Sequence, residues 1–349
     1  MAEKALLFIP DISGFTEFVQ HTAIQHSRHI ISELLELLID NNTTGLQLAE
    51  IEGDALFFYK MEATTNIKQI REQVKRMYLA FHTYLKRYEY EKICHCGACS
   101  SVYNLCLKFI IHHGEIEFIS IKDTNKPYGS NVIKVHRLLK NEVPISEYVL
   151  FTEEVHMTTE NQLQSDYDFG TITYAFEALG NYKTELPEIS PIPDNVPKHN
   201  LYSEEAVINM PILELYEVIS NFDHRLLWDK RISKVEYEKN RVNRLGEKHK
   251  CLINKTTYNP TTVTKKAKET QLVYGESATK IPMVKKLNIY FVLEAVNAEK
   301  TNLQIEVFVD FKPFGILIKP FMKKNFQKVI PKIIKELILL ADSGFKTHQ

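Results

Sequence analysis

Four prolines within eleven residues divide this chain of 349 residues; they are Pro187, Pro191, Pro193 and Pro197. Proline fixes φ and lacks a backbone N–H, so this stretch can neither continue a helix nor join the interior of a sheet. We therefore predict a semi-rigid linker at residues 187–199, between a first domain at 1–186 and a second at 200–349.

The two halves on either side of the linker differ in charge. Residues 200–349 carry 25 Lys and Arg against 17 Asp and Glu, whereas residues 1–199 carry 18 against 27. The basic half predicts either anionic partners or simply a solvated surface. The whole chain has a net charge of −1 and a pI near 6.9, and it lacks an aromatic–basic motif, so we expect no nucleic-acid binding.

The composition excludes several classes of protein. With 25% charged and 44% apolar residues, the chain is typical of globular proteins and unlike a disordered chain or a coiled coil. The N-terminus resembles no signal peptide, and no apolar stretch approaches the ~20 residues of a membrane span. Five unevenly spread cysteines are typical of a reducing compartment. We expect a cytoplasmic protein that is not an integral membrane protein.

Hydrophobic spacing in the first half alternates between strand and helix patterns. Two predicted hairpins turn at residues 52–54 and near His113-Gly114. The predicted order is a strand at Lys4–Ile9, a helix around Ile30–Leu38, a hairpin at Gln47–Tyr59, a helix around Ile67–Phe81, a hairpin at Leu105–Ser120, a helix at Gly129–Lys140 and a strand. This order predicts an α+β sandwich with helices on one face of the sheet.

Two aspartates stand at the ends of predicted strands. Asp11 ends the first strand, and Asp54 lies at the tip of the first hairpin. If the two strands are neighbours, both carboxylates meet at one sheet edge and could hold two divalent cations, Mg²⁺ or Mn²⁺. The structural alternatives stay open, because an Asp before a helix is also a common N-cap and a Gly-Asp pair is also a common turn.

Four ordered segments resemble motifs of the class III adenylate and guanylate cyclases. FIPDISGFT resembles the first metal-binding motif, and EIEGDALFF resembles the hairpin that carries the second metal-binding Asp. LKFIIHHGEIEFI and YGSNVIKVHRLL resemble a later hairpin and the helix that supplies transition-state residues. The resemblance covers about residues 3–185 and implies a ferredoxin-like fold, a head-to-tail homodimer and a nucleoside triphosphate bound across the interface.

The resemblance also assigns roles to individual residues. It places the metal on Asp11 and Asp54, the triphosphate on the turn that includes Ile12, Gly14 and Phe15, and phosphate-charge stabilisation on the catalytic candidate Arg137. The base-selecting positions are occupied by Glu50 and Lys126, which could form a salt bridge that closes the purine pocket or could read a different base.

One departure from the cyclase pattern affects the chemistry. The family has Asn four residues before the arginine, whereas this chain has Ile133, and an alkyl group donates no hydrogen bond. Loss of one transition-state donor costs ~10²–10³ in rate. We therefore expect a degenerate cyclase-like signalling protein that binds nucleotide and metal. The alternatives are an active Mn²⁺-dependent cyclase regulated by the second domain, and a lipid carrier whose first domain is a dimerisation scaffold.

A cysteine cluster interrupts the cyclase-like pattern. Cys94, Cys96 and Cys99 form a C-x-C-x-x-C motif, and Cys106 follows seven residues later. Three thiolates at this spacing can bind one Zn²⁺, with Cys106 or a histidine as the fourth ligand. We predict a structural zinc site in an insert near residues 94–106; the alternative is a loop of free or redox-active thiols.

The second half resembles the START-like SRPBCC superfamily, which has a helix-grip fold. A strand at Ala206–Asn209 leads through Pro211 into a helix, two long strands follow (LNIYFVLEAV and LQIEVFVDF), and the last element is amphipathic. The resemblance implies a curved sheet around a C-terminal helix, with an apolar small molecule or lipid between them. Gly315–Met322 could act as an apolar lid, and a solidly packed core is the alternative.

Overall fold

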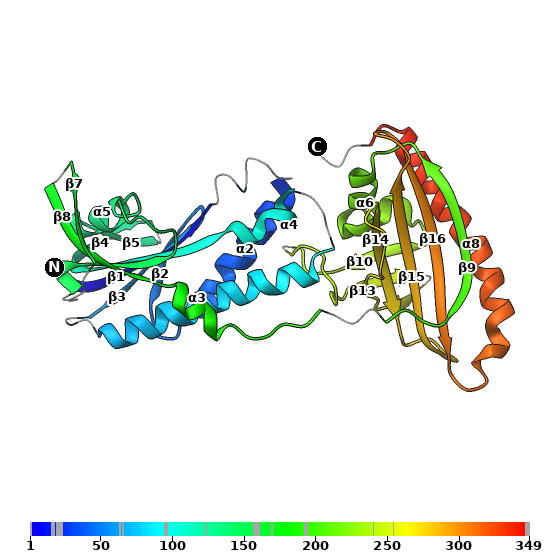
Figure 1. Cartoon of the computed structure of the whole chain (residues 1–349), viewed down its shortest axis with the longest axis horizontal. Coiled ribbons are helices and arrows are strands. Elements are labelled where there is room, and N and C mark those ends of the chain that lie inside the picture. Colours follow the sequence, from blue (N-terminus) through cyan, green and yellow to red (C-terminus); the bar gives the residue numbers. More distant parts are fainter. Residues whose placement is uncertain are drawn as a thin grey trace. The chain divides into compact units, whose positions relative to one another are not determined.

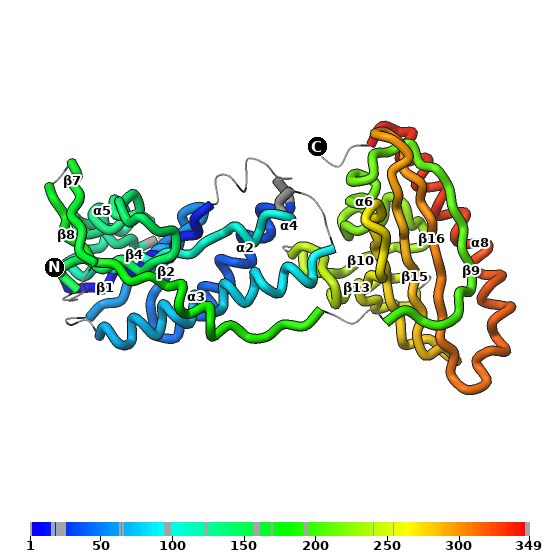
Figure 2. The backbone as a smooth tube through the Cα atoms, in the orientation of Figure 1, coloured from blue at the N-terminus to red at the C-terminus, as the bar shows by residue number. Residues whose placement is uncertain are grey.

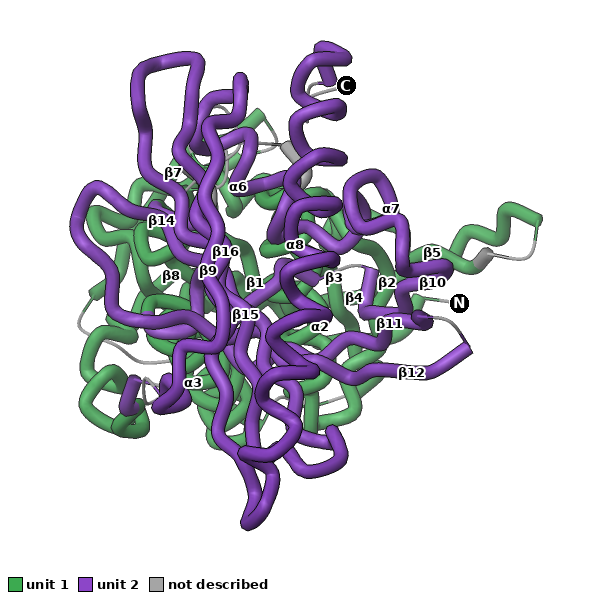
Figure 3. The backbone as a smooth tube through the Cα atoms, turned by 90° about the vertical axis from the view of Figure 1, so that its right-hand side faces the viewer, with its two compact units in different colours: residues 1–89, 101–189 green, residues 90–100, 190–349 purple. Residues whose placement is uncertain are grey.

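The structure, a computed structural model of the whole chain, describes residues 2–14, 18, 24–62, 64, 66–93, 97–122, 124–155, 161–168, 170–191, 195–239, 241–253 and 255–345. Figure 2 draws the remainder in grey. The chain forms two compact units, which Figure 3 colours separately. Unit 1 comprises residues 1–89 and 101–189, and unit 2 comprises residues 90–100 and 190–349. The α+β class predicted from the sequence is confirmed.

Unit 1 is built on a mixed sheet that, among its described residues, has eight strands. The strand order is β2-β3-β1-β4-β6-β8-β7, and β5 pairs with β4; β4 and β6 are parallel. The elements are β1 (Glu3–Ser13), α2 (Ile24–Asp40), β2 (Gln47–Glu52), β3 (Ala55–Met61), α3 (Ile67–Glu91), η1 (Val102–Asn104), β4 (Cys106–Ile121), β5 (Thr124–Tyr128), α5 (Ser130–Arg137), β6 (Tyr148–Thr152), η2 (Glu153–Val155), β7 (Gln162–Tyr167), β8 (Gly170–Ala178) and η3 (Gly180–Glu185).

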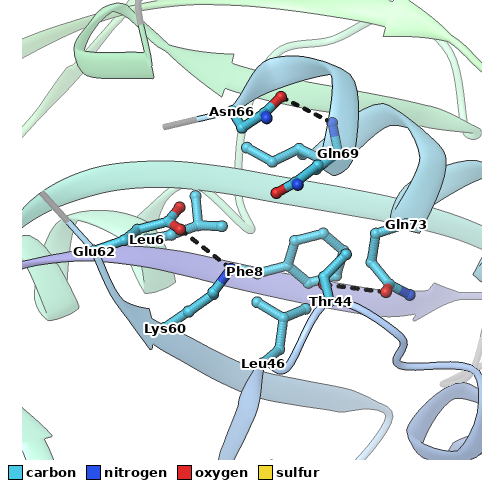
Figure 4. A pocket seen from close by; sticks show the side chains of 10 residues that line it. Leu6, Phe8, Thr44, Leu46, Lys60, Glu62, Asn66, Gln69 and Gln73 are labelled. Carbon is cyan, nitrogen blue, oxygen red and sulfur yellow. Dashed lines mark hydrogen bonds and ion pairs between the residues drawn. The ribbon is translucent and has the colours of Figure 1, made fainter. Parts of the chain in front are cut away.

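Helices cover both faces of this sheet, so the prediction of helices on one face is wrong (Figure 1). One face of β1 packs in a core cluster that includes Ala5, Leu7, Ile9, Val135 and Leu138, the last two from α5 and its C-terminal cap. The opposite face meets α3 around a gap of about 10 Å³ whose lining includes Leu6, Phe8, Ile70 and Gln73 (Figure 4). The physical reason is visible in β1 itself, because a strand covered on both faces is continuously apolar and does not alternate.

The second predicted hairpin, Leu105–Ser120, is wrong, because nearly all of these residues belong to one continuous strand, β4. β4 runs straight through His113 and Gly114, which pair with Leu6 and Ala5 of β1. The chain reverses at Lys122, after which β5 pairs back onto β4. Gly114 does not form a turn; it allows α5 to pack closely on β4, because a Cβ there would lie 2.5 Å from Cγ of Asn131 in α5. The first hairpin does turn at Glu52-Gly53-Asp54, where Gly53 has a φ of +67°.

Unit 2 contains a five-stranded antiparallel sheet, in the order β13-β14-β15-β16-β9, and a three-stranded sheet, β10-β11-β12, as far as its residues are described. Its elements are α4 (Gly97–Ser101), β9 (His199–Ile208), α6 (Ile212–Ser220), η4 (Phe222–His224), α7 (Arg225–Trp228), β10 (Ile232–Glu236), β11 (Lys250–Ile253), β12 (Thr256–Tyr258), β13 (Thr261–Val263), β14 (Gln271–Ala278), β15 (Val284–Ala295), β16 (Thr301–Phe311), η5 (Gly315–Ile318) and α8 (Lys319–Asp342).

The C-terminal helix α8 packs along the larger sheet of unit 2, as Figure 1 shows. Its apolar stripe lies in one core cluster with residues of β9, β15 and β16. The buried residues of α8 are Phe326, Ile330, Ile333, Ile334 and Leu337. These are the residues from which the sequence predicts an amphipathic final element. Binding of an apolar ligand between helix and sheet stays a prediction.

A partly buried carboxylate joins three parts of unit 1. Glu147 contacts His82 and Lys183 in ion pairs of 2.6 Å each and accepts a 2.9 Å hydrogen bond from Tyr78. Burial alone would raise the pKa of Glu147, but these three partners outweigh it and lower the pKa from 4.5 to about 2. The charged carboxylate therefore stabilises the folded state.

Glu147→Gln is expected to lower the stability of unit 1 at pH 7 by about 2 kcal/mol, after allowing for solvent screening. Because the folded pKa lies below the unfolded one, this stabilisation is present above pH 4.5 and is lost as the pH falls towards 2. Hydrogen exchange in α3 and β6 of both proteins measures the difference. The matched control is Glu185→Gln, which removes an exposed pair with Lys75 and should change little. A loss that stays constant down to the lowest pH would contradict this account.

Candidate functional site

An open cleft of about 410 Å³ lies between β2, β5 and α5 of unit 1. Its lining combines apolar walls with charged groups of both signs. The lining residues are Ala49, Glu50, Glu52, Phe57, Lys126, Pro127, Val132, Ile133, His136, Arg137 and Lys140. Four residues singled out in the sequence, Glu50, Lys126, Ile133 and Arg137, therefore meet in one place.

A bulge in β2 sets the position of Glu50. The register with β3 shifts between Leu48 and Glu50, so that Glu50 lies opposite Phe57. A bulge of this kind re-aims the side chains that follow it. The Glu50 carboxylate lies 2.9 Å from Nζ of Lys126 on β5, and both side chains are about two-fifths exposed. The salt bridge that the sequence suggested is thus formed, between two residues that line the cleft.

Helix α5 supplies the opposite wall of the cleft. It begins after Gly129, whose φ of +132° is unfavourable for residues with a side chain. Arg137, in its last turn, is 58% exposed, and its guanidinium lies 3.8 Å from Asp168. Ile133, one turn earlier, is also more than half exposed. The cleft therefore has a cation at one position and an alkyl group where the cyclase pattern has a hydrogen-bond donor.

His136 is a cleft residue that the sequence did not single out. Its Nδ1 lies 2.7 Å from the carbonyl oxygen of Val132, and its Nε2 lies 2.8 Å from the carboxylate of Glu52. Both partners are hydrogen-bond acceptors, and together they fix the orientation of the ring. The ring also packs edge-on against Phe57 at 4.8 Å. No sequence signal relates His136 to Glu52, because 84 residues separate them.

A buried network anchors α5 to the sheet beneath it. His112 of β4 is fully buried; its Nε2 lies 2.9 Å from Oδ1 of Asn131 and its Nδ1 lies 2.8 Å from the Thr152 hydroxyl. The Asn131 amide donates to the carbonyl of Glu115 at 2.8 Å. Burial would raise the pKa of Glu154, but hydrogen bonds from His112 and Lys134 hold it well below its usual range. Asn131 is thus fixed on the sheet and is not among the residues that line the cleft.

The two candidate metal-binding aspartates are neighbours, Asp11 in β1 and Asp54 in the turn that leads into β3. Asp11 of β1 pairs with Ala55 of β3, next to Asp54, and the Ile12 N–H donates to the Asp54 carbonyl at 3.0 Å. The pKa of Asp54 is raised, first by burial and then by the charge of Asp11. This pair of carboxylates therefore carries an excess of negative charge that a cation would relieve.

Lys108 already neutralises part of that charge. It lies directly across from Asp11 on β4, with Nζ 2.9 Å from the Asp11 carboxylate and 3.2 Å from the carbonyl of Leu139. It also lowers the pKa of Asp54, more weakly than burial and Asp11 raise it. Sequence reasoning missed Lys108, although a lysine in the apolar run of β4 is a signal of a specific partner. Among the described residues, no group of three or more His, Cys, Asp or Glu side chains is placed to hold a metal.

The predicted phosphate-facing turn is described only in part. Gly14 follows β1 with a φ of +88°, and its carbonyl accepts from the N–H of Phe18 at 3.0 Å. Phe15 lies outside the described residues. The N–H of Ile12 already donates a hydrogen bond to the carbonyl oxygen of Asp54.

The predicted zinc ligands are also described only in part. Cys94 and Cys96 lie outside the described residues. Cys99 is fully buried in α4, and Cys106 is half-buried at the start of β4. The structural zinc site therefore stays a prediction.

The family model described as "Protein of unknown function (DUF2652)" matches residues 31–148, which include β2, β3, β4 and α5 of the candidate site. The "Uncharacterized protein Rv2561/Rv2562" of Mycobacterium tuberculosis (strain ATCC 25618 / H37Rv) is 33% identical over 175 residues, which cover 49% of this chain and 80% of that protein. The chain belongs to the same family as this mycobacterial protein.

Solved structures with similar folds include cyclases and a START protein. A bacterial light-regulated adenylyl cyclase is 13% identical with a TM-score of 0.39; the match covers 51% of this chain and about half of that one (52%). The adenylyl cyclase CyaB from P. aeruginosa is 14% identical with a TM-score of 0.34, over 51% of this chain and 95% of that one. A START superfamily protein from Mycobacterium smegmatis is 12% identical with a TM-score of 0.32, over 41% and 98%. Such similarities concern the fold alone and assign no activity.

No helix within the described residues combines the length and the apolar character needed to cross a bilayer.

Proposed function

We propose that unit 1 binds a purine nucleoside triphosphate with a divalent cation, and that it acts as a signalling module with little or no turnover. The observation that carries the proposal is the 410 Å³ cleft that brings Glu50, Lys126 and Arg137 together. A volume of this size suits a small-molecule ligand. Apolar walls at Ala49, Phe57 and Val132 suit a planar base, and the cations suit phosphates.

The metal end of the proposal rests on Asp11 and Asp54. Their adjacency and the raised pKa of Asp54 favour a cation, whose chemical contribution would be to neutralise charge on the phosphates. Lys108 competes for the same charge, because it already pairs with Asp11. We therefore expect weaker cation binding than two unpaired carboxylates would give.

Ile133 is the reason to expect little turnover. Its alkyl side chain lines the cleft one turn before Arg137, and it can donate no hydrogen bond to a reacting group. Asn131, the nearest amide in α5, is fixed by His112 and the carbonyl of Glu115. Loss of one preorganised donor costs ~10²–10³ in rate.

The proposal is tested by thermal unfolding of the full chain with ATP or GTP, each with Mg²⁺ or Mn²⁺. One nucleotide at 100 times its dissociation constant should stabilise unit 1 by about 2.7 kcal/mol. Arg137→Ala and Lys126→Ala should each reduce this stabilisation, because each removes a cation from the cleft. Lys75→Ala, which removes an ion pair elsewhere in unit 1, is the matched control and should not.

Two outcomes would favour the alternatives. Cyclic nucleotide formed with Mn²⁺, and abolished by Asp54→Ala, would indicate an active cyclase. The absence of stabilisation by any nucleotide would overturn the proposal and favour a dimerisation scaffold. The homodimer implied by the cyclase resemblance stays a prediction that sedimentation of the full chain can test.

A further inference from the structure

The connection between β16 and α8 lies at one end of the larger sheet of unit 2 (Figure 1). Several large apolar side chains along this connection are exposed. Phe314 is 80% exposed, Leu317 75% and Phe321 77%, and Ile316 is about half exposed. Scattered exposed apolar residues are ordinary, but four within eight residues form a patch that marks an interaction surface. We call this patch, together with Met283 of the adjoining loop, the apolar tip.

The backbone holds the apolar tip in this exposed form. The carbonyl of Met283 accepts from the N–H of Lys312 at 3.0 Å, and Gly315 packs so closely that a Cβ would lie 2.1 Å from the same oxygen. Met283 and Phe314 both have a positive φ, of +63° and +64°. Large side chains rarely adopt this conformation, and where it occurs it points to a function. The exposure of Phe314 is therefore built into the turn.

The surface around the apolar tip is basic. Residues 311–335 contain seven lysines and no acidic residue. The lysines are Lys312, Lys319, Lys323, Lys324, Lys328, Lys332 and Lys335. Within α8, Phe321, Lys324 and Lys328 share one face, because they lie three and four residues apart. A lysine row thus runs along the helix from the exposed aromatic ring.

We propose that the apolar tip and its lysines form a docking surface for a bilayer that carries anionic lipid headgroups. Exposed Phe and Leu side chains beside a row of lysines match the two layers of a membrane surface: the rings enter the acyl boundary and the ammonium groups pair with headgroup phosphates. Charge complementarity favours a uniformly anionic surface, such as a membrane, over a protein surface of mixed charge, because residues 311–335 carry seven lysines and no acidic residue. This inference concerns unit 2 and does not depend on nucleotide binding by unit 1.

The test is co-sedimentation of the full chain with two kinds of vesicle, phosphatidylcholine alone and phosphatidylcholine with about a third phosphatidylglycerol. We expect binding at least about tenfold tighter to the anionic vesicles, weakening as salt is added. Phe314→Asn with Phe321→Gln should reduce that binding by about tenfold or more. Asn tolerates a positive φ and Gln is a good helix former, so both changes preserve the fold.

The matched control is Leu339→Gln, which replaces an exposed residue of the same helix far along the chain from the tip and should leave vesicle binding unchanged. Lys323→Glu with Lys324→Glu should weaken binding to anionic vesicles and flatten its salt dependence. Equal binding to both kinds of vesicle, or unchanged binding by the Phe314→Asn/Phe321→Gln variant, would overturn the proposal. Light scattering completes the test: self-association lost in the same variant, without vesicle binding, would assign the tip to a second copy of the chain instead.

Discussion

Replacing Arg225 by methionine is expected to destabilise unit 2 by about 3–5 kcal/mol. The Arg225 guanidinium is buried and forms two parallel hydrogen bonds of 2.7 and 2.8 Å with the carboxylate of Glu276, which also accepts from the Tyr274 hydroxyl at 2.8 Å. Burial would raise the pKa of Glu276, but Arg225 and His249 hold it well below its usual range. Removing Arg225 leaves a buried charge without its main partner, which is the costly way to break an ion pair.

Unfolding of unit 2 can be followed by the fluorescence of Trp228, the single tryptophan of the chain. The ring lies 4.4 Å from the Arg225 guanidinium, so the variant will alter the starting signal but not the meaning of the urea midpoint. The double variant Arg225→Met with Glu276→Gln should recover part of the loss, because no unpaired charge remains. Arg241→Met, which breaks an exposed pair with Glu238, should cost under about 0.5 kcal/mol. Equal losses of stability for Arg225→Met and Arg241→Met would contradict a stabilising role of the buried Arg225–Glu276 pair.

Phe8→Ala is expected to lower the free energy of unfolding of unit 1 by about 3–5 kcal/mol. Phe8 is fully buried at the centre of β1, and its ring packs edge-on against Phe109 at 5.7 Å and Phe58 at 6.4 Å. Because helices cover both faces of the sheet, the space left by the ring cannot be filled by solvent or by a loop. Hydrogen exchange of β1, β3 and β4 reports the loss within unit 1.

Phe118→Ala is the matched control for this prediction. Phe118 lies on β4 like Phe109, but it is about two-fifths exposed, and its ring packs edge-on against Tyr59 at 5.4 Å. Its replacement should cost under about 1.5 kcal/mol. If both substitutions accelerate exchange equally, the core of unit 1 is not where the structure places it.

The class of fold and many of its elements were predictable from local sequence. The hairpin at residues 52–54 is fixed by Gly53, which supplies the positive φ of the turn. The spacing of Ile30 to Leu38 and of Ile67 to Phe81 predicted α2 and α3, and the last amphipathic segment predicted α8. Such elements depend on the period of apolar residues and on turn residues, which are properties of neighbours in the chain.

The candidate site was predictable only where motifs marked it. Glu50, Lys126 and Arg137 came from the motif resemblance, and the structure brings them to one cleft. No motif pointed to His136 and Glu52, which contact each other, or to Lys108, which pairs with Asp11. Their pairing is set by strand register and by the position of α5 on the sheet, and neither is contained in the local pattern.

The sequence by itself determined the α+β class and the hairpin that carries Asp54. Only the tertiary structure placed residues 90–100 with the second half of the chain in one compact unit. Only the tertiary structure decided that Gly114 makes room for Asn131 instead of forming a turn, and that Lys108 neutralises Asp11. It alone also paired Arg225 with Glu276, 51 residues away, and held Phe314 exposed by packing Gly315 against Met283. The reason is physical: turns and periodicity depend on neighbouring residues, whereas burial and charge pairing depend on which distant residues the folded backbone brings together.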